Sequence, residues 1–119
     1  MQYLLLIYAG EANAAAASET DARQMTAAYF AYAEAMTQAG VLVGGSRLRP
    51  TSTATTIRSP GGKTQVLDGP YAETKEQLGG YFMIEVPDLD TALSWAERCP
   101  GTAHGAVEVR PVWPTAEYS

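Results

Sequence analysis

The chain has 119 residues, enough for one domain with a real hydrophobic core and too few for two ordinary domains, so one domain over residues 1–119 is expected. Apolar residues make up 46% of it and no long polar tract occurs, which excludes a disordered chain. The 13 acidic and 8 basic side chains give a formal charge of −5 without any basic cluster, which argues against a nucleic-acid partner.

Residues 2–9, QYLLLIYA, are expected to form the first strand. This apolar run resembles a secretory signal only faintly, because no Lys or Arg precedes it. It is also far shorter than the ~20 residues that a membrane span requires. The sequence therefore predicts a strand here and no association with a membrane.

Two later segments have the periodicity of helices. In residues 18–40 the recurring side chains are Met25, Tyr29, Tyr32 and Met36. Ser18 is the expected N-cap, in a capping box with Asp21, and Gly40 the expected end. In residues 87–101 the recurring side chains are Leu89, Ala92, Leu93 and Ala96. Acidic residues at the start of this segment and Pro-Gly at its end are typical of helix boundaries.

The remaining apolar segments read as strands. Residues 41–48 and 80–86 follow the first helix and precede the second one, and 106–113 close the chain. In the last strand Val107 and Val109 alternate with Glu108 and Arg110, so each pair should occupy its own face. Two stretches rich in β-branched residues, 51–59 and 63–67, flank PGG as the strands of a hairpin would. This hairpin is predicted to lie outside the core.

The order of elements is β-α-β, hairpin, β-α-β. Without the hairpin this is the split arrangement of an α+β ferredoxin-like fold, with an antiparallel sheet and both helices on one face. The first strand is apolar on both sides, and so is GYFMIEV, yet no third helix remains for the second face. We therefore expect a homodimer in which two sheets face each other around a cavity that fits a small-molecule ligand.

The sequence offers little for a metal or a cofactor. A single cysteine, Cys99, excludes a disulfide framework and a cysteine-based zinc site, and fits a reducing, cytoplasmic compartment. One histidine, His104, cannot build a His-rich metal site. GGKT at 61–64 resembles the end of a phosphate-binding loop, but Ile57 stands where the first glycine of that loop would be. No metal and no cofactor are predicted.

The stretch LDGPYAETKEQLGGY, residues 67–81, gathers four charged side chains between glycines and a proline. It closely resembles the signature of YCII-related proteins of the DGPF subgroup, with Tyr71 in place of the Phe that gives the motif its name. The resemblance continues through LRPTSTATTIR, LGGYFMIEVPDLDTALSWAERCP and GAVEVRPV, and so covers nearly the whole chain. It implies a dimeric α+β barrel, similar in shape to muconolactone isomerases and small cofactor-free oxygenases.

The resemblance supports Asp68 as an acid or base, because the motif puts it where a strand meets the loop. The alternative is that Asp68 is a turn residue whose side chain bonds backbone amides. The partners considered for its charge, or for a ligand, are the cations Arg47, Arg49, Lys75 and Arg110. Glu73, Lys75 and Glu76 of the motif either line a ligand site or form a solvated loop with a local charge pair.

Two further positions have open roles. Histidine is the residue type best suited to proton transfer near neutral pH, so His104 is a second catalytic candidate. The His-Asp pair proposed for some YCII relatives cannot be transferred, because the expected first helix contains no histidine. Glu108 and Arg110 are expected to face the cavity between subunits, where they would form an interface ion pair or contact a ligand.

Three functions remain open. The first is a cofactor-free lyase or isomerase acting on a small polar molecule, with Asp68 as the acid or base. The second is a module that binds a small ligand or a protein, since DGPF members are often encoded beside extracytoplasmic-function sigma factors. The third is a non-catalytic dimeric scaffold.

Overall fold

The computed structural model describes residues 1–117 and confirms the α+β architecture with an antiparallel sheet. The main sheet has the order β2-β5-β1-β6, made of Leu42–Arg47, Gln77–Glu85, Gln2–Ala9 and Gly105–Pro111. The helices are α1 (Glu11–Ala16), α2 (Glu19–Gln38) and α3 (Leu89–Glu97). The predicted hairpin forms as β3 (Thr55–Arg58) and β4 (Gln65–Asp68). Among the described residues no helix is long and apolar enough to cross a membrane.

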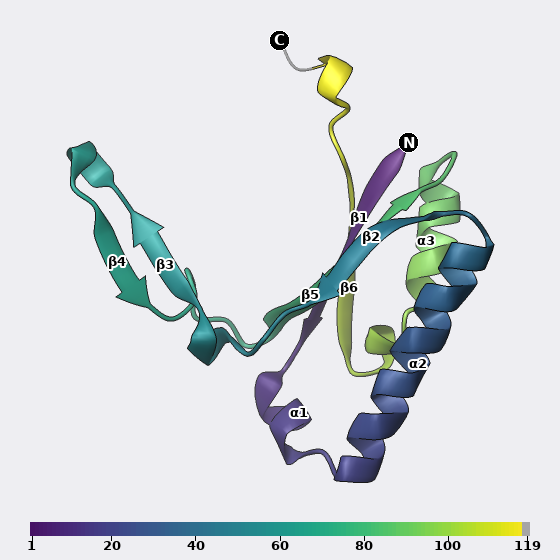
Figure 1. Cartoon of the computed structure of the whole chain (residues 1–119), viewed down its shortest axis with the longest axis horizontal. Helices are drawn as coiled ribbons and strands as arrows, with labels where there is room; N and C mark the ends of the chain where they lie inside the picture. Colours follow the sequence, from purple (N-terminus) through teal and green to yellow (C-terminus); the bar gives the residue numbers. More distant parts are fainter. Residues whose placement is uncertain (118–119) are drawn as a thin grey trace.

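Helices α2 and α3 cover one face of the sheet and form the core with it (Figure 1). Strand β1 alternates strictly, with Tyr3, Leu5 and Ile7 buried on the helix side. Met36 of α2 and Ile84 of β5 are further anchors of the core, both 0% exposed. Because cross-strand neighbours share a face, the pairing of Tyr3 with Ile84 aligns the core side chains of two strands.

Helix α2 begins and ends where its sequence predicts. The Ser18 hydroxyl accepts a hydrogen bond from the Asp21 amide at 3.1 Å, which satisfies one free donor of the first turn. At the other end Gly40 has φ = 73°, and the Gly40 and Val41 amides donate to the Thr37 and Met36 carbonyls. This is a Schellman ending, which favours glycine at the left-handed position.

Helix α3 presents a different face to the sheet from the one that its leucines indicate. Leu89 and Leu93 are 48% and 43% exposed, while the small Ala92 and Ala96 are buried. Trp95 packs against the core, and its carbonyl accepts a hydrogen bond from the Tyr32 hydroxyl at 2.6 Å. Small side chains therefore bring α3 close to its neighbours, and one bulky indole fills the remaining space.

Within residues 1–117 no helix lies over the second face of the main sheet, here called the open face (Figure 1). The side chains that register places on it include Leu4, Leu6, Tyr8, Leu78, Tyr81, Met83, Glu108 and Arg110. All but Arg110 are half-buried, shielded only by their neighbours. The expectation of a sheet that is apolar on both faces but covered on one is confirmed.

The β3–β4 hairpin, residues 55–68, projects from the sheet as an arm on the side opposite α2 and α3 (Figure 1). The molecule is flat, with extents of 48 × 47 × 19 Å. Its radius of gyration is 16.4 Å, whereas a compact chain of this length would have about 13.5 Å. The arm, as the sequence predicts, does not belong to the core.

We expect Met36→Ala to lower the free energy of unfolding by about 2–5 kcal/mol, because the truncation leaves a cavity between α2 and the sheet. Phe30 on the same helix is 74% exposed and offers a matched control, since Phe30→Ala should change stability by no more than about 0.5 kcal/mol. Urea denaturation at one fixed protein concentration measures both. Equal losses for the two variants would contradict this description of the core.

The N-cap of α3 should make stability depend on pH. The Asp88 carboxylate accepts hydrogen bonds from the Thr91 hydroxyl at 2.7 Å and the Thr91 amide at 2.8 Å, and these contacts lower the pKa of Asp88 below its ordinary 3.8. A depressed folded-state pKa means that the contact stabilises the fold above the unfolded-state pKa and is lost as pH falls through the folded-state value.

Asp88→Ala should therefore be less stable than the native chain near pH 7, and the difference should shrink toward about pH 2. Asp88→Asn keeps a neutral cap acceptor, so its advantage over Asp88→Ala should not vary with pH. Thermal unfolding measured across this range tests both variants. A constant deficit of Asp88→Ala at every pH would show that the carboxylate charge plays no part.

Candidate functional site

One end of the main sheet collects nearly all the candidate residues. Because β1 runs antiparallel to β5 and β6, and β2 antiparallel to β5, Ala9, Arg47, Gln77 and Gly105 all lie at the same end. The connections to α1, to the arm and to the charged loop leave from this end (Figure 1). We call it the arm end of the sheet.

A polar network involving Glu11 fixes the arm end. The Glu11 carboxylate accepts hydrogen bonds from the Thr51 amide at 2.7 Å and the Thr51 hydroxyl at 2.8 Å. The Glu11 amide donates to the Gln77 side-chain oxygen at 2.9 Å, and the Gln77 amide group donates to the Thr74 carbonyl at 2.7 Å. Helix α1, the segment that leads into the arm and the charged loop are thus joined through three side chains.

The sequence pattern indicates neither helix α1 nor a role for Glu11. The six residues of α1 are EANAAA, none of which is buried, so the segment has no apolar periodicity to indicate a helix. The contacts of Glu11 span 40 and 66 positions of the chain. Only the folded chain brings these groups together.

Asp68 ends β4 at the base of the arm and is exposed. Gly69 follows with φ = 108°, and its amide donates to the Ala54 carbonyl at 2.7 Å. The Gly69 carbonyl in turn accepts from the Thr56 hydroxyl at 2.8 Å. The turn is therefore held by backbone groups and a threonine, and the Asp68 carboxylate forms no hydrogen bond or ion pair with any residue that the structure describes.

Two arginines lie at the same end. Arg47, Leu48, Arg49 and Pro50 line an open recess of about 290 Å³ where the chain leaves β2. Both guanidinium groups are in exposed residues, and within residues 1–117 neither forms a salt bridge. Two cations at a recess can hold an anionic group through charge-assisted hydrogen bonds.

The other charged residues of the motif, Glu73, Lys75 and Glu76, lie in the exposed loop between β4 and β5. Across the described chain none of the three takes part in a salt bridge, so the local charge pair considered from the sequence does not form. The Thr74 hydroxyl donates to the Glu76 carbonyl at 2.6 Å and shapes the loop instead.

His104 is at the arm end but at the opposite edge of the sheet. It follows the turn Pro100–Ala103 and immediately precedes β6, the far edge strand from β2, and it is exposed. Three strand spacings, about 14 Å, separate these two edges. The structure therefore does not bring His104 next to Arg47 within one chain.

Glu108 and Arg110 lie on the open face, as the alternation of β6 predicts. They stand opposite Leu6 and Leu4 of β1. The Arg110 Nε donates to the Glu108 carboxylate at 2.8 Å, and a second guanidinium nitrogen contacts the same oxygen. An ion pair formed within one chain thus interrupts an otherwise apolar surface.

Cys99 is an internal thiol rather than a reactive one. It is 1% exposed, and its thiol lies 3.9 Å from the Tyr29 hydroxyl as a weak donor. Burial raises the pKa of Cys99, which disfavours the thiolate required of a nucleophile. Burial likewise raises the pKa values of Tyr29 and Tyr32, so both phenols stay neutral.

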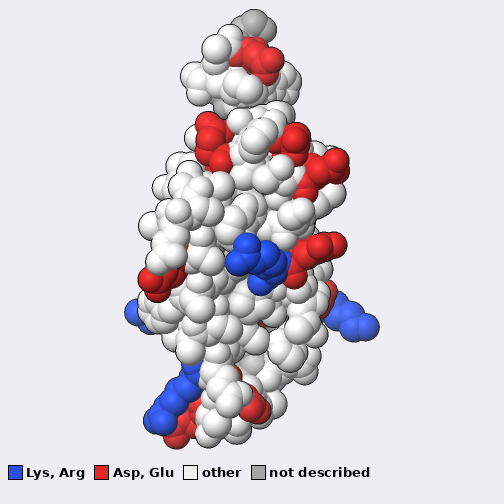
Figure 2. All heavy atoms as spheres, turned by 90° about the vertical axis from the view of Figure 1, so that its right-hand side faces the viewer, with Lys and Arg blue, Asp and Glu red and all other residues white. Residues whose placement is uncertain are grey.

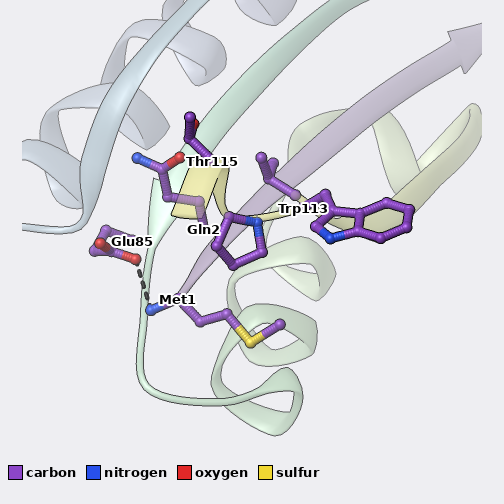
Figure 3. A pocket seen from close by; sticks show the side chains of 7 residues that line it. Met1, Gln2, Glu85, Trp113 and Thr115 are labelled. Atoms are coloured by element: carbon purple, nitrogen blue, oxygen red, sulfur yellow. Dashed lines mark ion pairs between the residues drawn. The ribbon is translucent and has the colours of Figure 1, made fainter. Parts of the chain in front are cut away.

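A second recess, of about 250 Å³, lies at the end of the sheet away from the arm end. Figure 3 shows it between the start of β1 and the segment after β6, with the Trp113 indole at its rim. The Met1 ammonium group forms an ion pair with Glu85 there at 2.7 Å. None of the candidate residues lines this recess.

Charge on the helix-covered side does not form a basic surface. Figure 2 shows this side with acidic groups over much of its height and isolated basic groups between them. The basic residue of α2 is Arg23, paired with Glu19, and Arg98 directly after α3 is stacked over the Trp95 ring. Within this view nothing resembles a track for a phosphate backbone.

The fold and the arm end define an α+β protein with a split βαβ sheet, one covered face and a cationic recess at one end. Residues 1–116 match the model of the YCII-related domain, and the chain belongs to this family. An uncharacterised protein from Rhizobium meliloti (strain 1021) is 38% identical over 114 residues, covering 94% of this chain and 92% of the relative. The family expected from the sequence is confirmed.

A solved structure shares the fold. It is a 5-chloro-2-hydroxyhydroquinone dehydrochlorinase from Burkholderia phenoliruptrix AC1100, in complex with 2,5-dihydroxybenzoquinone. The superposition covers all of both chains with a TM-score of 0.55 and 17% sequence identity. At that identity the likeness establishes the architecture and leaves the reaction of this chain open.

The network of Glu11 should hold the base of the arm. Glu11→Ala removes two hydrogen bonds to a carboxylate, each contributing about 1.5–3 kcal/mol, so the Thr51 amide should exchange its hydrogen at least about tenfold faster. Glu19→Ala, which removes an exposed charge pair on α2, is the matched control and should leave Thr51 unchanged. Unaltered exchange at Thr51 in Glu11→Ala would contradict this role.

Proposed function

We propose that this YCII-related protein is a cofactor-free, lyase-like enzyme that acts on a small anionic molecule as a homodimer. The observation that carries the proposal is the state of Asp68, an exposed carboxylate at the arm end whose turn is held by other groups. A purely structural Asp would be expected to accept backbone amides, as Asp88 does at the start of α3. Asp68 is thus available for proton transfer.

The chemistry follows from the charges at the arm end. Arg47 and Arg49 would hold the anionic group of the substrate and stabilise the negative charge that develops on its oxygen. Asp68 would take a proton from the carbon beside that group. The electron pair of the broken C–H bond forms a double bond, and the leaving group departs with its own bonding pair. This elimination needs no oxidant or reductant.

The dimer supplies the enclosure that one chain lacks. Six apolar side chains of the open face are half-buried, and burying such surface stabilises by roughly 25 cal/mol per Å². A second copy facing it would cover these side chains and exclude water from the space between the sheets. Glu108 and Arg110 would then provide polar contacts within that space. His104, at the far edge, has no role in the proposed reaction.

The same arrangement without turnover would be a ligand-binding module. The observation that favours this second candidate is the cationic recess, which can bind an anion whether or not Asp68 transfers a proton. The shared fold with a dehydrochlorinase supports the enzyme over the module. A scaffold without a ligand would not account for the two exposed arginines and Asp68 at the arm end.

The test uses the substrate and the bound quinone of the structural relative. Chloride release from 5-chloro-2-hydroxyhydroquinone measures turnover, and calorimetry with 2,5-dihydroxybenzoquinone measures binding. Arg49→Ala should weaken binding at least about tenfold, through loss of a charged hydrogen bond. Asp68→Asn should keep binding and lower turnover by about 100- to 10,000-fold.

Arg23→Ala is the matched control, because Arg23 pairs with Glu19 on α2, away from the arm end. Binding without turnover in the native chain would support the binding module. Turnover that survives Asp68→Asn, or binding that Arg49→Ala leaves intact, would refute the assigned roles.

A further inference from the structure

The arm is a hairpin that lacks the packing needed for its own stability. Its two four-residue strands pair only with each other, and an isolated two-stranded hairpin is marginal in water. Ile57 and Val66, which share one face, are 65% and 62% exposed, and Leu67 on the other face is 52% exposed. Such a concentration of exposed β-branched and aliphatic side chains on a protruding ribbon marks a surface that another molecule covers.

The two faces of the arm differ. In the register of the hairpin, Thr55 pairs with Asp68 and Ile57 with Val66, so these four side chains share one face, the docking face. On the opposite face the Arg58 guanidinium lies over the Tyr71 ring, 4.7 Å from its centre, and so links the hairpin to the segment after it. The docking face has no such cover. It carries two aliphatic side chains and the free Asp68.

We propose that the docking face packs against a second copy of this chain, so that the two arms clasp the dimer and enclose Asp68 at the subunit boundary. This inference rests on the homodimer of the proposed function. The arm projects on the same side of the sheet as the open face, so a copy lying on the open face also lies beside the arm (Figure 1).

Shape and charge favour a second copy as the occupant. The radius of gyration of 16.4 Å exceeds the value of about 13.5 Å for a compact chain, and the arm is one of the segments that extend away from the sheet (Figure 1). The arm carries Arg58 and Lys63 near its tip, whereas the whole chain has a charge of −5. The tip of the arm, where Arg58 and Lys63 outnumber the single acidic residue Asp68 at its base, is thus attracted to the acidic body of an identical chain.

The clasp would shield the Asp68 carboxylate from water, which a single chain does not do. Alone, the carboxylate is exposed to water at the base of the arm. Once Ile57 and Val66 are buried against the second copy, Asp68, two residues along the same strand from Val66, comes within the same boundary. Each site would then need both copies, because one provides Asp68 and the other provides the surface that shields it.

The native protein provides the first test, through its lysines. The chain has only two, Lys63 at the tip of the arm and Lys75. A carbodiimide joins a lysine to a carboxylate in direct contact, so mixed ¹⁴N- and ¹⁵N-labelled copies should yield Lys63 cross-links between light and heavy chains. Cross-links of Lys63 confined to chains of one label, or none at all, would overturn the clasp.

The second test measures the dimer. Ile57→Lys and Val66→Lys should each weaken association at least about tenfold by sedimentation, since each removes a buried aliphatic side chain from two arms. Both residues are exposed in the single chain, so neither substitution should unfold it. Phe30→Lys, at an equally exposed apolar position on α2, is the matched control and should leave association unchanged.

The third test follows Asp68 itself. Cys99 is buried, so Asp68→Cys introduces a thiol whose reaction with a maleimide can be followed alone. It should react at least about tenfold more slowly than Gln65→Cys, on the opposite face of the arm, and Ile57→Lys should abolish that protection. Equal rates for the two thiols in the dimer would overturn the enclosure of Asp68.

Leu6→Lys, on the open face, tests the facing sheets of the proposed homodimer without altering the arm. Comparing it with the arm variants therefore distinguishes a failure of the clasp from a failure of the homodimer. If Leu6→Lys dissociates the dimer while the arm variants do not, the clasp is wrong but the homodimer with facing sheets is supported. If the native chain is a monomer at every concentration, both fail.

Discussion

The structure depends on a mismatch between a sheet that is apolar on both faces and helices that cover only one. The alternation of β1 places Tyr3, Leu5 and Ile7 under α2 and α3, and leaves Leu4 and Leu6 on the other side. Covering the first face creates the core. The second face remains a large apolar surface, and surfaces of this kind in folded proteins mark sites of association.

The position of the chemistry follows from the direction of the strands. Antiparallel pairing sends the connections of β1, β2 and β5 to one end of the sheet, where Glu11, Arg47 and Asp68 come from three distant parts of the chain. Glu11 ties these connections together through Thr51 and Gln77. A rigid sheet thus positions charged groups at the ends of the elements that meet there, next to the connecting loops, as is frequent in ligand sites.

The sequence predicted every strand of the main sheet, both core helices and the hairpin, because each has a strong local signal. Helix α2 is the best example, with its N-cap at Ser18 and its glycine ending at Gly40. Alternation also assigned Glu108 and Arg110 to the correct face of β6. The packing of α3 could not be predicted in the same way, because Leu89 and Leu93 have helical spacing yet remain exposed.

The sequence by itself determined the family, through the motif around Asp68, and the order of elements, through periodicities of two and 3.6 residues. Tertiary structure alone decided that Glu11 binds Thr51, that Glu108 pairs with Arg110 within one chain, and that His104 lies across the sheet from Arg47. The reason is physical. Periodicity reflects which face of an element is buried, whereas contacts between distant residues depend on how whole elements pack.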